Sequence, residues 1–181
     1  MKRAAPMGFM AILFGMAVGG MVMTSLRASV VLVVATVVYG VTFEVDQWFL
    51  LIAVFLLTLA ALYGLGMVLA SLYLVWGREA FQMNQVFIEP VYFVSGLNFP
   101  VMSLGLVGAL AIATIPLAVG LDAMRQLAFV GSPFPPGTPS VEVETLILVA
   151  MSIGFTLVAR VMLARLERMA RREGRLSIRW Q

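Results

Sequence analysis

The stretch EPVYFVSGLNFP, residues 89–100, decides how this sequence is interpreted. It places a carboxylate, two prolines, a Ser-Gly pair and an asparagine at the start of an uncharged apolar run that continues to Leu121. Proline and the Ser-Gly pair interrupt regular helix. In a bilayer, broken backbone is tolerated only where protein or a water-filled cavity satisfies its polar groups. The stretch therefore predicts a specialised membrane segment rather than a plain anchor.

The composition of the whole chain indicates an all-α integral membrane protein. Hydrophobic residues make up 62% of the 181 residues and charged residues 12%, and the mean hydropathy is +1.03. A soluble domain is usually about half apolar and about a quarter charged. Helices are the expected elements because a helix satisfies all of its backbone hydrogen bonds within one segment.

Missing residue types exclude several classes of site. The chain has no cysteine and no histidine, so disulfides and the usual zinc, haem and iron–sulfur sites are not expected. Lys2 is the only lysine, which excludes the P-loop motif GxxxxGK[ST] and hence ATP binding of that kind. The sequence also shows no clustered pair of carboxylates suited to acid–base catalysis, so a membrane-embedded enzyme is disfavoured.

Charge is distributed unevenly and predicts the orientation in the membrane. Seven arginines lie between Arg160 and the last residue, whereas segments 44–46 and 122–144 carry five acidic residues against Arg125 alone. Basic flanks remain in the cytoplasm, so both basic ends are predicted inside and the acidic connections outside. The arginines are expected to contact membrane lipids. No nucleic-acid partner is expected.

Apolar runs and helix breakers predict one transmembrane domain, 1–181, with four crossings and a re-entrant helical piece. Residues 7–43 are too long for one straight crossing, since a helix of that length measures about 55 Å against a hydrocarbon core of about 30 Å. One tilted span with an interfacial part is favoured over two short spans, and a cleaved signal peptide is disfavoured. The predicted parts are a first span at 7–43, spans at 47–77 and 80–100, a re-entrant segment at 101–125, an extracytoplasmic loop at 126–141, a last span at 142–165 and a cytoplasmic basic tail at 166–181.

Four residues outside the opening stretch are candidates for packing or positioning. Gly15 and Gly19 form a GxxxG pattern that allows close approach of another helix, although glycines also occur scattered in membrane helices. Asp122 and Arg125 are three residues apart, so on a helix they can form an ion pair that positions the outer segment. Glu89 is an isolated carboxylate in apolar surroundings, with either a functional or a structural role.

Three motifs in register resemble a known family. EPVYFVSGLNFP is followed by IPLAVGLDAMRQLAFVG at 115–131 and by the ending REGRLSIRWQ at 172–181. Together they resemble ABC-2 type transporter permeases over roughly residues 40–181. The family has six spans, and this chain is similar to its C-terminal two-thirds. The first two spans and most of the ATPase-docking loop have no counterpart here.

The resemblance implies the function, partners and location. It implies a permease subunit in the inner (plasma) membrane that dimerises with a second copy or a homologue. A separate ATP-binding cassette ATPase would bind ATP and Mg, and this chain would hold no cofactor. The cargo would be a lipophilic drug-like compound, a lipid or a lipid-linked polysaccharide. An alternative is a non-transporting membrane subunit that assembles or regulates another complex.

The residues that interrupt the apolar runs are predicted to line the transport pathway or to form its outer gate. These positions combine small size, hydrogen-bonding groups and interrupted helix, and in the family this region forms the re-entrant helices on the outer side. The predicted gate residues are Glu89, Pro90, Ser95, Gly96, Asn98, Pro100 and Pro116.

Overall fold

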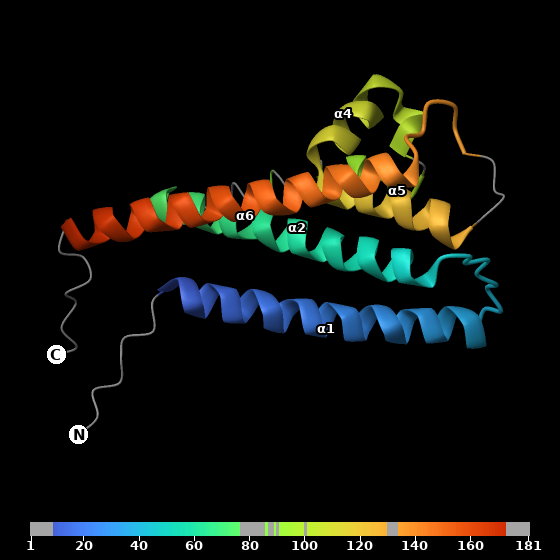
Figure 1. Ribbon diagram of the computed structural model, residues 1–181, viewed down its shortest axis with the longest axis horizontal. Coiled ribbons are helices and arrows are strands. Elements are labelled where there is room, and N and C mark those ends of the chain that lie inside the picture. Colours follow the sequence, from blue (N-terminus) through green and yellow to red (C-terminus); the bar gives the residue numbers. More distant parts are fainter. Residues whose placement is uncertain are drawn as a thin grey trace. The chain divides into compact units, whose positions relative to one another are not determined.

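The computed structural model describes residues 9–76, 86, 89, 91–99, 101–129 and 134–172. Within them the protein is helical, and the one β-type pairing is an isolated bridge between Glu44 and Phe129. This confirms the all-α prediction. The elements shown in Figure 1 are α1 (Phe9–Val37), α2 (Trp48–Trp76), the 3-10 helix η2 (Val101–Leu104), α4 (Leu106–Thr114), α5 (Pro116–Ala128) and α6 (Val141–Arg172).

Three of these helices are long and apolar enough to cross a membrane. The candidate spans are Gly15–Val37 in α1, Trp48–Ser71 in α2 and Val141–Arg165 in α6. They correspond to the spans predicted at 7–43, 47–77 and 142–165, the third beginning one residue earlier than predicted. About half of the predicted span at 80–100, and all of the tail beyond residue 172, lie outside the described residues. The predicted total of four crossings therefore stays a prediction.

The chain divides into two compact units. One unit contains Met1–Thr42 and Leu163–Gln181, and the other is Phe43–Met162. In the first unit, hydroxyl groups of α1 donate to carbonyl oxygens one turn earlier, as in Ser25 to Met21 and Ser29 to Ser25, both at 2.9 Å. Such bonds satisfy polar side chains inside an apolar helix without a second chain.

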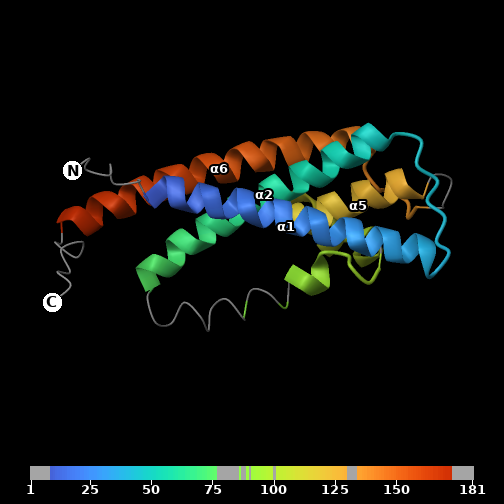
Figure 2. The ribbon, with the colours of Figure 1, turned by 90° about the horizontal axis from the view of Figure 1, so that it is seen from below.

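The core of the second unit lies where α5 packs along the first half of α2 (Figure 2). Its buried side chains come from α2, η2, α4, α5 and α6, which brings residues almost a hundred positions apart into one cluster. Val54 of α2, Val119 of α5 and Leu148 of α6 have no exposed surface. The α2 and α6 helices run in the same direction and begin at the end where α5 ends (Figure 1).

Glycine permits the closest contacts in this unit. A Cβ at Gly120 of α5 would lie 2.2 Å from the Thr58 side-chain oxygen and 2.8 Å from the Thr58 Cβ. A Cβ at Gly64 of α2 would lie 3.1 Å from the Phe155 Cβ of α6. Since real Cβ contacts are longer than the first two distances, α5 approaches α2 this closely only because residue 120 has no side chain.

The helices α4 and α5 are too short to cross a bilayer. With 9 and 13 residues, they measure about 14 and 20 Å, against a hydrocarbon core of about 30 Å. Between them, Ile115 has extended backbone (φ −109°, ψ 110°) and Pro116 occupies the first helical position of α5. A residue before proline is disfavoured in helical geometry, and proline is well accommodated at a helix start. Pro116 therefore ends one short helix and begins the next.

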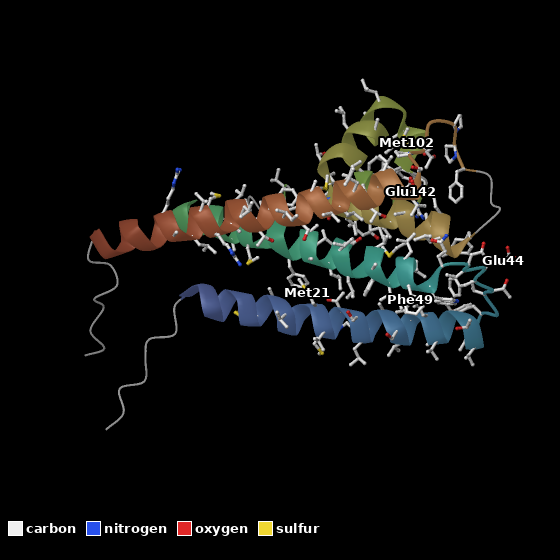
Figure 3. The ribbon with its side chains drawn as sticks, in the orientation of Figure 1. Met21, Glu44, Phe49, Met102 and Glu142 are labelled. Atoms are coloured by element: carbon white, nitrogen blue, oxygen red, sulfur yellow. The ribbon has the colours of Figure 1, made fainter. Side chains whose placement is uncertain are left out.

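Both predicted acidic connections lie at one end of the second unit. The bridge from Glu44 to Phe129 and the contact of the Phe43 and Phe129 rings, 5.9 Å between centroids, join the segment before α2 to the end of α5. Figure 3 shows Glu44 and Glu142 at this end of the unit, with Glu142 in the first turn of α6. Both carboxylates are exposed.

Candidate functional site

Arg125 of α5 forms hydrogen bonds with the turn formed by Ser95–Phe99. One guanidinium nitrogen donates to the Phe99 carbonyl oxygen at 3.1 Å and another donates to the Leu97 carbonyl oxygen at 3.0 Å. Residues 91–94 are helical and the turn follows them directly, so these carbonyls lie where a helix has just ended. Carbonyl groups at such a position lack partners within the helix, and a cationic fork is well suited to satisfy them.

The turn itself depends on Ser95 and Gly96. The Ser95 hydroxyl is buried and donates to the Tyr92 carbonyl oxygen at 2.7 Å. Gly96 has φ +79°, and a Cβ there would lie 2.2 Å from a Val101 methyl group. A positive φ is costly for residues with a Cβ. The Ser-Gly pair is therefore a structural requirement for ending this helix against η2.

A pair of carboxyl groups is buried at the contact between α5 and α6. Asp122 is 3% exposed and Glu144 has no exposed surface. Asp122 lies close enough to Glu144 to act on it electrostatically. Among the described residues, Asp122 Oδ2 and Glu144 Oε1 have no hydrogen-bond donor. We call Asp122 and Glu144 the carboxyl pair.

Gln126 forms a hydrogen bond with the second carboxyl oxygen of Glu144. Its amide nitrogen donates to Glu144 Oε2 at 3.0 Å and to the Pro139 carbonyl oxygen at 3.1 Å. One side chain of α5 thus binds both the first turn of α6 and the loop that precedes it. Thr138 stabilises that loop by donating its hydroxyl to the Pro135 carbonyl oxygen at 2.7 Å.

The electrostatics of the carboxyl pair are unfavourable if both groups are charged. Two unit charges 4 Å apart repel by about 4 kcal/mol at an effective dielectric constant of 20. Glu144 lies in the first turn of α6. There the helix dipole stabilises a carboxylate by only about 0.3–1 kcal/mol. The nearby cation, Arg125, donates to the carbonyls of Leu97 and Phe99. The site therefore favours one negative charge over two.

These contacts differ from two expectations drawn from the sequence. Asp122 and Arg125 lie on one helix, but Arg125 donates to backbone carbonyls of the 95–99 turn instead of pairing with Asp122. Asp122 instead faces the buried Glu144 of α6. The sequence also showed no clustered pair of carboxylates suited to acid–base catalysis, whereas the structure places two buried carboxyl groups near each other. Asp122 and Glu144 are 22 positions apart, and only the packing of α6 on α5 brings them together.

The predicted gate residues fall into different surroundings. Ser95, Gly96 and Pro116 are buried, whereas Glu89 and Asn98 are exposed. Pro90 and Pro100 lie outside the described residues. Arg125, in the last turn of α5, links this helix to the turn at 95–99, whereas Pro116 lies in the first turn of α5.

Gly15 and Gly19 have open surroundings. A Cβ added at either position meets no described atom within 4 Å, and both residues are exposed. Close approach of a helix from another chain at this GxxxG pattern stays a prediction.

Sequence reasoning missed Glu144, Gln126 and Gly120. Glu144 was counted only as part of an acidic connection, and Gln126 and Gly120 were quoted only within a motif. Asp122, Gln126 and Gly120 are each separated from their partners by a loop or several helices, so no local spacing indicates the contacts. One available signal was the position of Glu144 at the start of an apolar span, since a carboxylate there needs a partner.

No protein-family model, curated protein or solved structure matches the chain.

Proposed function

We propose that this protein is the transmembrane permease subunit of an ATP-driven exporter of the ABC-2 type. The observation that carries the proposal is the broken helical pair α4–α5. Neither helix is long enough to span, and α5 packs along the first half of α2. An anchor needs only complete spans. Interrupted helices that are held within protein are the elements from which membrane pathways and gates are built.

The turn at residues 95–99 and the helix α5 would form the outer gate. Arg125 joins them through its two bonds to backbone carbonyls, and the small residue Gly120 lets α5 lie close to α2. Movement of this connected segment relative to a second permease would open a passage towards the outer side. The exposed apolar side chains of the spans suit contact with lipid, with lipophilic cargo or with that second copy.

Energy would come from a separate ATPase, since the sequence contains no P-loop motif. We expect the tagged full-length protein, purified from its own cells in mild detergent, to bring down an ATPase with a P-loop. Reconstitution of the two in lipid vesicles should stimulate ATP hydrolysis in a Mg-dependent manner. An unrelated protein with three spans and the same tag serves as the control. Partners without nucleotide-binding motifs would instead favour the alternative, a non-transporting subunit that assembles another complex.

The proposed location is the inner (plasma) membrane, with both termini in the cytoplasm. The absence of native cysteine allows a direct test with single cysteines and a thiol reagent that does not cross membranes. Asp46→Cys and Ser140→Cys, at exposed positions before α2 and α6, should react in intact cells. Ser177→Cys should react only after the membrane is permeabilised. Reaction of all three in intact cells would contradict this orientation.

A further inference from the structure

Each member of the carboxyl pair contributes one oxygen that lacks a hydrogen-bond donor. Asp122 Oδ2 and Glu144 Oε1 are both buried and both lack a donor among the described residues. The remaining oxygen of Glu144, Oε2, accepts a bond from Gln126. Buried acceptors in proteins are almost always satisfied. One hydrogen atom placed between the two free oxygens would satisfy both at once.

The surroundings of the pair suit a proton better than a metal cation. Calcium and magnesium require six or more oxygen ligands, including water. The described residues contain no group of three or more acidic side chains able to hold a metal ion. Gln126 presents its amide nitrogen, a donor, to Glu144, and Pro139 uses its carbonyl oxygen to accept from the same nitrogen. A proton needs only the two oxygens that are free.

The helices around the carboxyl pair carry few other charged side chains. The described part of α2, and the segment formed by η2 and α4, contain no charged residue. On α5 the one other charged side chain is Arg125, which donates to the 95–99 turn. On α6, Glu142 is exposed. The loop at 134–140 carries no charge.

We propose that Asp122 and Glu144 form a proton-binding site, in which a single proton bridges Asp122 Oδ2 and Glu144 Oε1. The proton comes from water, and the pair retains one negative charge. Gln126 donates to that charge at Glu144 Oε2, and the amino-terminal end of α6 stabilises it further. No covalent bond other than the O–H bond forms or breaks.

Binding of a proton at this site strengthens the contact between α5 and α6. With the proton bound, the two helices share a hydrogen bond. Loss of the proton leaves two adjacent like charges and no donor between them, which weakens this contact. This inference depends on neither the cargo nor the energy source, so it can fail without affecting the proposed exporter function.

The direct test is infrared spectroscopy of the purified protein in detergent near neutral pH, with H₂O exchanged for D₂O. Exposed carboxyl groups are ionised at this pH, so a carbonyl band of a protonated carboxyl group reports a bound proton. We expect one such carboxyl group per chain, with a band that shifts in D₂O. The band should be lost in Glu144→Gln and in Asp122→Asn and unchanged in Glu142→Gln, which alters an exposed carboxylate two residues away.

The wild-type spectrum decides the question even if a variant does not fold. Absence of the band, with both carboxyl groups ionised, would overturn the proposal. Saturable stabilisation of the wild type by Na⁺ or Ca²⁺ that is lost in Glu144→Gln would also overturn it, because it would assign the site to a cation. Retention of the band in both amide variants would place the proton elsewhere and would equally refute the site.

Discussion

Gly120→Ala is expected to destabilise the protein by about 1–3 kcal/mol, the usual cost of overpacking a close contact. The added Cβ would lie 2.2 Å from Oγ1 of Thr58, 2.4 Å from Cγ2 and 2.8 Å from Cβ. Rotation of the threonine side chain does not move its Cβ, so α5 must shift away from α2. Unfolding of the purified protein in mixed detergent micelles measures the loss.

The matched control for this substitution is Gly154→Ala in α6. Gly154 also lies inside a helix, but a Cβ there meets no atom within 4 Å. This variant should be neutral or more stable by about 0.5–1 kcal/mol, because alanine favours helix over glycine. In Gly120→Ala, adding Thr58→Ala should recover part of the stability, since it removes the two nearest atoms. Equal effects of the two glycine substitutions would show that the α2–α5 contact is not close.

Arg125→Met is expected to release the 95–99 turn from α5. The methionine keeps an unbranched apolar stem but provides no donor, so the carbonyl oxygens of Leu97 and Phe99 lose their bonds at 3.0 and 3.1 Å. Hydrogen bonds to a charged group contribute about 1.5–3 kcal/mol when buried. Because one of these bonds is exposed, we expect a loss near the lower end. Faster amide hydrogen exchange of residues 95–99 measures the release.

Two variants show whether the guanidinium geometry matters. Arg125→Lys keeps the charge but replaces the planar fork by a single ammonium group, so it should protect the turn only in part. Arg160→Met removes an exposed arginine from α6 and should leave exchange at residues 95–99 unchanged. Unchanged exchange in Arg125→Met would mean that the turn is held by Ser95 and Gly96 without the arginine. In that case Arg125 would have no role in the proposed gate.

The carboxyl pair and Arg125 join α5 to different elements. Arg125 joins this helix to the turn, whereas Asp122 and Gln126 join it to the start of α6. A short helix held by three separate polar contacts is suited to defined alternative positions. In the proposed exporter, α5 would therefore be the part of the outer segment whose movement depends on both links.

The class of the protein and its helix breaks could be predicted from local sequence. A span was predicted at 47–77, and α2 covers Trp48–Trp76. Proline acts on its own backbone and on the preceding residue, so the break at Pro116 follows from a single position. The Ser-Gly pair likewise predicts the end of a helix, and Gly96 has the expected positive φ. These properties are local and need no knowledge of distant contacts.

Partners of the polar residues could not be predicted in this way. Spacing on one helix favoured a pair between Asp122 and Arg125, because local geometry is all that spacing describes. The observed partners, Glu144 for Asp122 and the 95–99 turn for Arg125, lie 22 and 26–28 positions away. Both α5 and α6 must be in place before these contacts exist.

By itself, the sequence determined that this is a helical membrane protein with a broken segment after residue 89. Hydrophobicity and backbone preference are properties of individual residues and short segments, so both can be assessed without a structure. Only the tertiary structure decided which polar groups meet inside it. The close contact at Gly120 lets α5 lie against α2, and the loop before α6 returns Glu144 to Asp122. A buried site of this kind depends on packing between distant segments, and no local pattern encodes that packing.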